Sequence, residues 1–511
     1  MLRSNRSSSA RRKEKDKEES GQSFSKIFLS ISLILIAIGS LYVYNLDGWL
    51  IHDDEGTHLY EAWRVSEGDV PGVDLITEQP PLFLLGGVLA GRLSDFNILA
   101  LRGVTVALAL LAGWPVFLIG NEVWGERVGL LGLVLYLINH MTYATTRLYM
   151  PDVWMLSFAI LGIYLFILSQ TRKRRGLLPL ASVAFALSTL SKLFGVLSLG
   201  GCLLFLAYQA LSRRATLRHT LGDGLLLILP FLLITPTAFL AFYPPSSAYY
   251  GSVLGHHWQQ GREASLLSRV GKGFLALGTF FYMNLSFLFT LPFLPRLGTS
   301  GRPGERILAW QTPTAFTFFL LSRNLWPRYW LYLIPAFALI LAYLIDRALN
   351  WLASRATPRT RPLIALASVG IILLALLQSA PRIFYRARLY DEDTRELAAY
   401  IAEQTAPDDT VLADYATLNF YARRPSVYQA SIIATGRIQS GLVTGAELIH
   451  EMEQRDVQMV LHHVPGGTNP PSHLVFLRDY DTFYTYLNTH YCMVRTFDRA
   501  GQLFEIYQIC P

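Results

Sequence analysis

The sequence predicts a polytopic α-helical membrane protein with a C-terminal soluble α/β domain. Hydrophobic residues make up 52% of the 511 positions and charged residues only 16%, with a mean hydropathy of +0.33. Soluble globular proteins average about 25% charged residues. Apolar runs recur along the first 380 residues and then give way to a soluble pattern. This composition excludes a disordered chain, a coiled coil and a basic nucleic-acid-binding arm.

The N-terminal segment is predicted to be a disordered cytoplasmic tail, residues 1–25. Its first twenty residues carry seven basic and four acidic side chains, so they cannot bury apolar surface. Residues 27–44 are then almost wholly apolar, and no small-residue cleavage motif follows them. This pattern indicates an uncleaved first transmembrane helix and not a signal peptide.

Eleven apolar runs predict about eleven spans in a membrane domain over residues 26–381. Basic residues, whose excess gives a net charge of +7, fall mainly in alternate loops, as the positive-inside rule requires. The loop 47–97 instead carries ten acidic residues against Arg64 and Arg92, which predicts an outer loop. The predicted spans are 27–44, 98–120, 128–147, 153–169, 177–191, 194–211, 221–241, 274–295, 307–322, 329–345 and 363–380.

One further apolar segment, residues 81–93, is predicted to lie at the outer interface without crossing. Its 13 residues would form a helix of about 20 Å, against a hydrocarbon core of about 30 Å. A crossing here would also invert every later loop and place the Arg172–Arg175 cluster outside.

Residues 382–511 are predicted to form an extracytoplasmic α/β domain. The pattern indicates helices over 394–404 and 446–455, strands over 410–414 and 457–462, and a closing hairpin of 491–497 with 503–509. Cys492 and Cys510 lie on the two hairpin strands. A disulfide and two unpaired thiols are both open.

The outer loop contains the run Asp53-Asp54-Glu55 directly after the first span. Adjacent carboxylates repel one another and are costly to desolvate. A solvated loop is one interpretation, and a general base or metal ligand at the mouth of a cavity is the other. Aromatic Tyr60 follows at helical spacing, and Glu78 returns the chain to the interface, which favours the second interpretation.

This loop resembles the first outer loop of the C-type (GT-C) glycosyltransferases, and most of all the dolichyl-phosphate-mannose protein mannosyltransferase-like group that includes the lipid A aminoarabinose transferase. The resemblance covers roughly residues 26–380. It implies a GT-C fold and transfer of a sugar, with inversion, from a polyprenyl phosphate to a hydroxyl or phosphate acceptor at the outer face of the inner (plasma) membrane. The resemblance rests on Asp54-Glu55-x4-Tyr60, Gly68, Pro71, Asp74 and Pro80-Pro81.

The resemblance also implies roles for single residues. Asp54 matches the base that activates the acceptor, with Asp53 as the alternative. Asp152 matches an acidic residue that opens the fourth span, although an aspartate there also suits the helix dipole. Glu78 with His257, or with its neighbour His256, matches a site for a divalent cation such as zinc or manganese.

The expected substrate-binding residues surround these carboxylates. Lys192 and Arg328 are expected to bind the donor phosphate, although a lysine can also extend to water, and Arg328 can anchor an aromatic belt with Tyr329. Gln79 stands where the aminoarabinose transferase has a lysine, which argues against aminoarabinose as the sugar. The predicted substrate-binding residues are Glu55, Tyr60, Gln79, Lys192, Arg328 and Tyr329.

The expected partners of the transferase are the lipid-linked donor, a lipid, glycan or protein acceptor and membrane lipids, but no nucleic acid.

Two other functions are alternatives to a transferase. A transporter of lipid-linked sugar or small solutes often shows two repeated halves and ionisable groups at mid-membrane. No internal repeat is found, and the acidic groups cluster at the outer boundary. An inactive relative whose outer domain only binds ligands is the other alternative.

Overall fold

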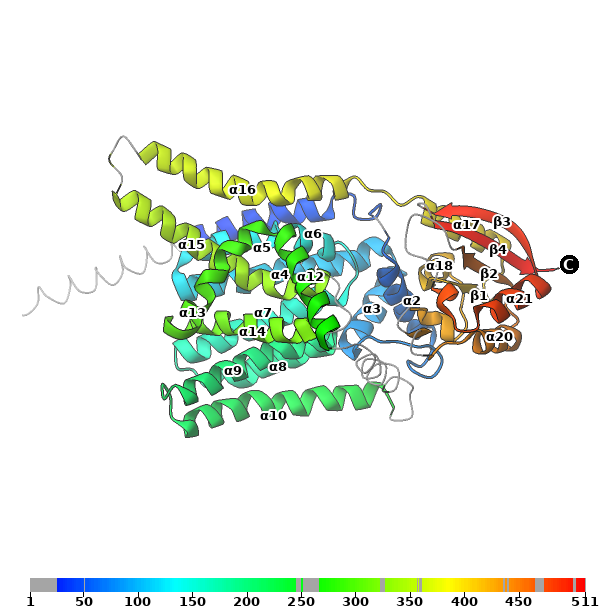
Figure 1. Cartoon of the computed structure of the whole chain (residues 1–511), viewed down its shortest axis with the longest axis horizontal. Coiled ribbons are helices and arrows are strands. Elements are labelled where there is room, and N and C mark those ends of the chain that lie inside the picture. Colours follow the sequence, from blue (N-terminus) through cyan, green and yellow to red (C-terminus); the bar gives the residue numbers. More distant parts are fainter. Residues whose placement is uncertain are drawn as a thin grey trace, which may run out of the picture.

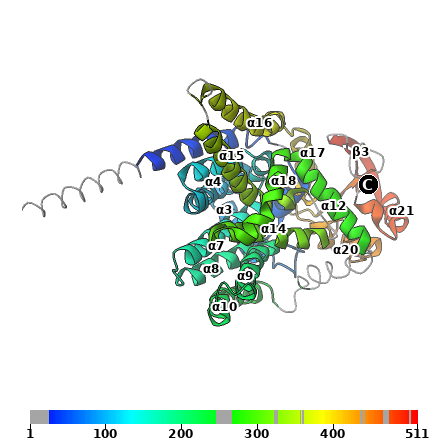
Figure 2. The ribbon, with the colours of Figure 1, turned by 60° about the vertical axis from the view of Figure 1, so that its left-hand side comes forward.

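The structure is a computed structural model in which a helical bundle is followed by an α/β domain. Figure 1 shows the bundle at one end of the molecule, the α/β domain at the other, and helices α2 (Asp53–Glu67) and α3 (Pro81–Ser94) between them. Figure 2 shows, after rotation, β3 (Tyr491–Arg499) and α21 (Tyr480–His490) of the α/β domain to one side of the bundle helices α4 (Ile98–Trp124), α7 (Pro151–Thr171) and α8 (Leu177–Ser191). The structure describes residues 25–49, 51–244, 250, 266–321, 327–355, 357, 361–434, 437–438, 441–464, 473–499 and 502–510.

Each of the eleven apolar runs predicted to span is helical in the structure. The bundle consists of the helix Ser25–Val43, α4 (Ile98–Trp124), α5 (Glu126–Leu137), α6 (His140–Thr146), α7 (Pro151–Thr171), α8 (Leu177–Ser191), η1 (Leu193–Gly195), α9 (Val196–Leu211), α10 (Leu217–Phe242), α12 (Leu266–Met283), η3 (Leu285–Phe293), α13 (Leu294–Ser300), α14 (Pro303–Leu321), η4 (Pro327–Leu333), α15 (Ile334–Arg355) and α16 (Arg361–Ala387).

The chain is a multi-pass membrane protein, but fewer helices than eleven meet a strict length and hydropathy test. Among the described residues six helices do so, or eight if two bent pairs each count as one span. The bends are 59° between α5 and α6 and 112° after α12. Asn139 and Asn284 stand at these two breaks, and the Asn139 side-chain amide donates to Asn284 Oδ1 at 2.7 Å. The two breaks therefore satisfy each other's polar groups inside the bundle.

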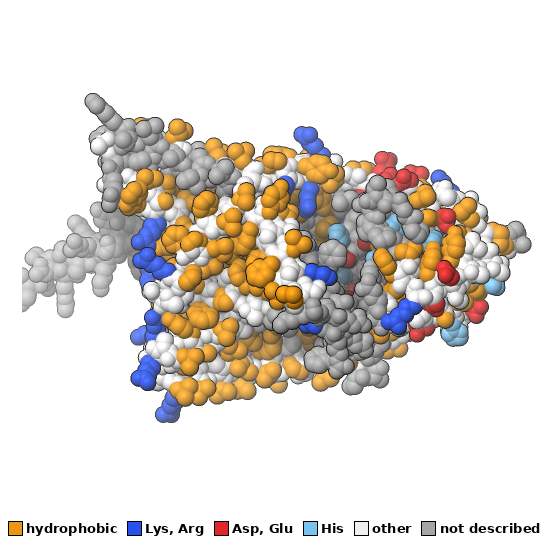
Figure 3. Space-filling model, viewed as in Figure 1, with side chains coloured by type: hydrophobic (Ala, Val, Ile, Leu, Met, Phe, Trp, Pro, Cys, Tyr) orange, Lys and Arg blue, Asp and Glu red, His pale blue; other side chains and the backbone are white. Residues whose placement is uncertain are grey.

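The surface of the bundle has the charge pattern of a membrane protein. Figure 3 shows apolar side chains over its middle, Lys and Arg at the end away from the α/β domain, and most Asp and Glu on that domain. The exposed Arg172–Arg175 cluster lies in the α7–α8 loop, and Arg213 and Arg214 lie in the α9–α10 loop. The two ends of the bundle differ in charge as the positive-inside rule predicts.

The C-terminal domain is a four-stranded sheet with helices. Its strand order is β1-β2-β4-β3, with β1 parallel to β2 and the other pairs antiparallel. A disulfide joins Cys492 to Cys510, so the first of the two predicted alternatives is the one found. The elements are α17 (Asp393–Gln404), β1 (Val411–Ala413), α18 (Ala416–Ala422), η5 (Gln429–Ile432), α20 (Gly445–Gln454), β2 (Met459–His463), η6 (Leu474–Phe476), α21 (Tyr480–His490), β3 (Tyr491–Arg499) and β4 (Gln502–Ile509).

Two predicted boundaries can be compared directly with the structure. The domain boundary at residue 382 lies inside α16, which continues through Pro381 to Ala387, so the α/β domain begins about ten residues later, at α17. The segment 81–93, which was predicted not to span, corresponds to α3, whose 14 residues begin at Pro81. Proline is favoured at the first position of a helix because its missing N–H has no intrahelical partner there.

Candidate functional site

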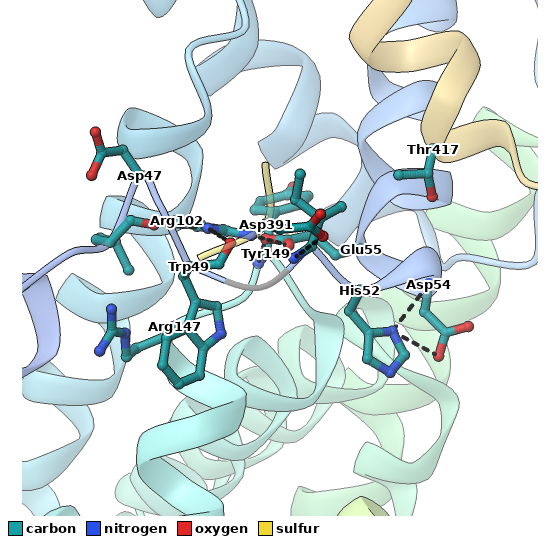
Figure 4. Close-up of polar contacts among 12 residues, drawn as sticks. Asp47, Trp49, His52, Asp54, Glu55, Arg102, Arg147, Tyr149, Asp391 and Thr417 are labelled. Carbon is teal, nitrogen blue, oxygen red and sulfur yellow. Dashed lines mark hydrogen bonds and ion pairs between the residues drawn. The ribbon is translucent and has the colours of Figure 1, made fainter. Parts of the chain in front are cut away.

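Helix α2 begins at the acidic run, so three carboxylates lie in its first turn. His52 caps this turn, because its Nδ1 accepts a hydrogen bond from the Asp54 backbone N–H at 3.1 Å. Negative charge is favourable at a helix N-terminus. Successive side chains on a helix point about 100° apart. Asp53, Asp54 and Glu55 therefore point in three different directions, and Figure 4 shows the side chains of Asp54 and Glu55 turned away from each other.

Glu55 points into the bundle and forms a buried ion pair with Arg102 of α4. The guanidinium donates to both carboxylate oxygens, at 2.8 and 2.6 Å, and both side chains are 0% exposed. The Tyr149 backbone N–H also donates to Glu55, at 2.7 Å. The predicted substrate-binding role of Glu55 is therefore wrong: its carboxylate is fully used in fastening α2 to the bundle.

Asp53 points to the C-terminal domain. Its Oδ1 lies 2.9 Å from Nη2 of Arg499, at the end of β3. The Thr417 hydroxyl of α18 donates to the Asp53 backbone carbonyl at 3.2 Å. If Asp53 were the base, it would thus have to accept the proton while it is ion-paired to Arg499 of the C-terminal domain.

Asp54 points to the bundle's outer rim, where it meets Arg328 of η4. Its Oδ2 lies 2.5 Å from Arg328 Nη2, and its side chain is 45% exposed. Burial raises the pKa of Asp54, but the charge of Arg328, aided by His52 and His58, outweighs burial and leaves the pKa below its usual value. The carboxylate is thus ionised and reachable.

A second ion pair lies beside the first. Lys192, between α8 and η1, places its Nζ 2.7 Å from Oδ1 of Asp152 at the start of α7. The Lys192 ammonium also lies 4.6 Å from the centre of the Tyr329 ring. Arg328 interacts electrostatically with Asp152 as well as with Asp54. The structure therefore brings together five of the predicted site residues, Asp54, Asp152, Lys192, Arg328 and Tyr329.

Glu78 lies half-buried near a different set of charges. Burial raises the pKa of its carboxyl and Asp54 adds to that, whereas Arg437 and His58 oppose it. Neighbouring Glu61 is fully buried, with His58 Nδ1 3.7 Å from its Oε2. Among the described residues no group of three His, Cys, Asp or Glu side chains is arranged to hold a metal ion. His256 and His257 lie outside the described residues.

Tyr60 does not form a sugar-binding surface. It is 2% exposed, and its hydroxyl accepts a hydrogen bond from the Ser426 backbone N–H at 2.9 Å. Burial raises the pKa of Tyr60 to about 12. Its predicted substrate-binding role is therefore wrong, because the ring packs between α2 and the C-terminal domain. Gln79 is half-buried, and its backbone carbonyl accepts from the Tyr243 hydroxyl at 2.6 Å.

Two comparisons relate this chain to known proteins. Residues 78–239 match the family model described as dolichyl-phosphate-mannose-protein mannosyltransferase. The fold is similar to that of ArnT from Cupriavidus metallidurans bound to undecaprenyl phosphate, with a TM-score of 0.63, 17% identity and coverage of 93% of this chain and 97% of that one. The chain has the C-type glycosyltransferase fold. The predicted resemblance and fold class are thus confirmed.

A more distant GT-C structure shows the same architecture. The archaeal oligosaccharyltransferase AglB from Archaeoglobus fulgidus, in complex with an inhibitory peptide and a dolichol-phosphate, gives a TM-score of 0.59 at 13% identity and covers 93% of this chain and 74% of that one. A search of curated proteins gives no match. Because these identities are low, the two structures establish the GT-C fold of the chain and leave its substrates open.

The sequence did not reveal several residues that complete the site. Arg499 and Thr417 reach Asp53 from more than 360 residues away, and no local pattern marks them. Arg102 did give a signal, since a lone arginine in the apolar run 98–120 requires a partner inside the membrane domain. That partner is Glu55.

Proposed function

We propose that the chain is a glycosyltransferase that moves a sugar from a polyprenyl phosphate to a hydroxyl or phosphate acceptor at the outer face of the bacterial inner (plasma) membrane. The observation that carries this proposal is the pairing of Asp54 with Arg328 beside the pairing of Asp152 with Lys192. The match to the mannosyltransferase family model and the GT-C fold support it. Structures with this fold hold undecaprenyl phosphate or dolichol-phosphate.

The two cations are suited to the donor phosphate. A guanidinium contacts a phosphate through two parallel hydrogen bonds, and an ammonium acts as a point charge. Before the donor binds, Arg328 and Lys192 are neutralised by the two carboxylates. The donor phosphate competes with these carboxylates for the two cations, so donor binding weakens the ion pair between Arg328 and Asp54. With the charge of Arg328 drawn to the phosphate, the pKa of Asp54 rises, and the carboxylate becomes a stronger base in the loaded site.

The proposed reaction is a single displacement. Asp54 takes the proton of the acceptor hydroxyl as its oxygen attacks the anomeric carbon. The bond from that carbon to the phosphate oxygen breaks, and the polyprenyl phosphate leaves with the electron pair, its charge held by Arg328 and Lys192. Attack opposite the leaving group inverts the anomeric centre. A retaining enzyme would instead need a second carboxylate as nucleophile about 5 Å from the first.

A divalent cation, zinc or manganese, belongs to the proposal only through Glu78 and His257, with His256 as the alternative. The described residues alone do not assemble such a site, so no step is routed through it. When bound, a cation there would help to hold the leaving phosphate. Elemental analysis of purified protein tests this: about one equivalent of metal that is lost in Glu78→Ala supports it. Equal metal content in both proteins removes the cation from the proposal.

Mass spectrometry of membrane lipids and surface glycans tests the proposed reaction and does not require the sugar to be known in advance. A strain that lacks the chain is expected to lose one sugar from one acceptor class. The wild-type chain should restore that sugar, and Asp54→Asn should not, because it keeps the shape of the side chain but cannot take the proton. Loss of a general base typically costs about 10²–10⁴ in rate. An unchanged set of sugars, or full restoration by Asp54→Asn, would overturn the proposal.

A further inference from the structure

The C-terminal domain, together with the short segment that leads into it, contacts the acidic loop at several points. The carboxylate of Asp391 accepts from the Ile51 backbone N–H at 3.2 Å, just before α2. The Ser431 hydroxyl accepts from the Ile76 N–H at 3.0 Å, just before Glu78. Arg437 adds a positive charge near Glu78. The segments that carry the candidate catalytic groups are thus held by a domain that begins some 340 residues later in the chain.

The strongest of these contacts is at Asp53. Arg499 has only 6% of its side chain exposed, and it binds Asp53 Oδ1 through Nη2 at 2.9 Å. Its Nε donates to the Thr394 hydroxyl of α17 at 2.6 Å, and its guanidinium lies 5.8 Å from the centre of the Tyr415 ring. The arginine is therefore fixed within its own domain before it reaches α2.

Helix α18 presses against the same turn of α2. A Cβ placed on Gly56 would lie 2.1 Å from Thr417 Oγ1, so only glycine allows this approach. Asp53 and Gly56 lie one turn apart on α2 and therefore face the same side. Arg499 and Thr417 thus contact the first turn of α2 on that side, while Arg102 forms an ion pair with Glu55 on another side.

We propose that the C-terminal domain positions the catalytic carboxylate, and that Arg499 is a positioning residue that acts on Asp54 through Asp53. This inference rests on the proposed function of Asp54. Asp53 and Asp54 are adjacent in a rigid turn, so an ion pair that fixes the first fixes the direction of the second. Arg499 also neutralises a like charge beside Asp54.

Misplacement of a reacting group by about 1 Å can cost about 100-fold in rate. Loss of the Arg499–Asp53 pair should therefore slow transfer by about 10- to 100-fold, which is less than the loss of the base itself. Binding of the donor phosphate should change little, since the ion pairs of Arg328 and Lys192 described above join Asp54 and Asp152. This division between rate and binding separates positioning from a general loss of structure.

The test uses full-length purified protein and the complemented strain, with variants on both sides of the contact. Arg499→Gln and Asp53→Asn remove the pair, their combination tests whether they act together, and Arg499→Lys retains the charge. The control is Arg495→Gln, an exposed arginine on the same strand. Three quantities are measured: restoration of the lost sugar, affinity for undecaprenyl phosphate, and hydrogen exchange of the backbone amides in the first turn of α2.

We expect Arg499→Gln and Asp53→Asn each to reduce sugar transfer by about 10- to 100-fold and to speed exchange in that turn, with no further loss in the double variant. Arg499→Lys should recover part of the transfer, and Arg495→Gln should behave as wild type. The inference is overturned if Asp54→Asn abolishes transfer while Asp53→Asn keeps it, or if the double variant loses the product of the two effects. If Asp54→Asn itself restores the sugar, the proposed function has failed instead.

Discussion

Asp53, Asp54 and Glu55 are neighbours in the sequence, yet each carboxylate has a different cation. Arg499, Arg328 and Arg102 come from three separate parts of the fold. The exposure of each acid follows its partner: Glu55 is buried completely, whereas Asp54 keeps 45% of its side chain open. This geometry favours Asp54 over Asp53 as the proposed base, because only Asp54 combines exposure with a cation suited to the donor.

Replacement of Arg328 by glutamine should raise the pKa of Asp54. The charge of Arg328 is the main influence that lowers this pKa, and burial opposes it. Without the arginine this lowering is lost, and the carboxyl should stay protonated to a higher pH than in the wild type. Infrared difference spectra of the carboxyl band across a pH titration measure this. Arg347→Gln is the matched control, since Arg347 bonds to Tyr343 near the other end of α15.

The same ion pair predicts a pH window for stability. A carboxyl whose pKa is lowered by folding stabilises the protein above its unfolded pKa, about 3.9 for aspartate, and the contribution is lost as pH falls through the folded value. As the pH is lowered from about 4, the free energy of unfolding of the wild type should therefore fall more than that of Arg328→Gln. The melting temperatures of the two proteins are measured in detergent across this pH range. A difference in melting temperature that does not change with pH would refute the prediction.

The sequence predicted Asp54, Asp152, Lys192 and Arg328 because each stands at the end of an apolar run, where charged groups meet the membrane surface. It failed for Glu55 and Tyr60, since a helix turns neighbouring residues in different directions, and only tertiary contacts decide which direction is open. Glu55 forms a buried ion pair with Arg102, and the Tyr60 hydroxyl accepts a hydrogen bond from the Ser426 backbone N–H. The contribution of the C-terminal domain to this loop had no local signal at all.

Among the structural elements, α2 is the one that joins the bundle side of the molecule to the C-terminal domain. It packs against α18 and α3, and the aromatic cluster that surrounds it includes Trp63, Phe83 and Phe420. The two helices and four strands predicted for the C-terminal domain have counterparts in the structure because strand alternation and helix periodicity are local, whereas α18 and α21 were not predicted. The bends after Leu137 and Met283 were not predicted, because each is stabilised by an asparagine pair that joins distant parts of the chain.

Substitution of Gly56 by alanine tests the close contact between α2 and α18. The added Cβ would lie 2.1 Å from Thr417 Oγ1 and 2.5 Å from its Cβ, so a helix must move. Overpacking of this kind typically costs about 1–3 kcal/mol. Gly103→Ala is the control, since a Cβ there meets no atom within 4 Å. Thermal unfolding should show a loss for Gly56→Ala and none for Gly103→Ala; equal stability would mean that the contact is looser than the structure shows.

The molecule as a whole separates positive and negative charge along its long axis (Figure 3). The arginine-rich loops lie at one end of the bundle, and the acidic loop and the α/β domain lie at the other. The proposed orientation, with the arginine-rich end in the cytoplasm, would put the proposed site and the disulfide Cys492–Cys510 outside, where disulfides form and persist.

Labelling of single cysteines by an impermeant reagent in intact cells tests this orientation. Asp408→Cys, exposed in the C-terminal domain, should be labelled from outside, and Arg174→Cys, in the α7–α8 loop, should be labelled only after lysis. The parent should carry Cys202→Ala, although that cysteine is buried. The reverse pattern would place the acidic loop in the cytoplasm and rule out transfer at the outer face.

The affinity of the purified protein for undecaprenyl phosphate tests most directly whether Arg328 and Lys192 form the donor site. The wild type should bind the phosphate and discriminate against undecaprenol, and both Arg328→Gln and Lys192→Gln should weaken binding by about tenfold or more, since a charge-assisted hydrogen bond is worth about 1.5–3 kcal/mol. Arg174→Gln, at the opposite end of the bundle, should bind as the wild type does. Equal affinity of the wild type for phosphate and alcohol, or unchanged binding in both variants, would show that these cations do not hold a lipid phosphate.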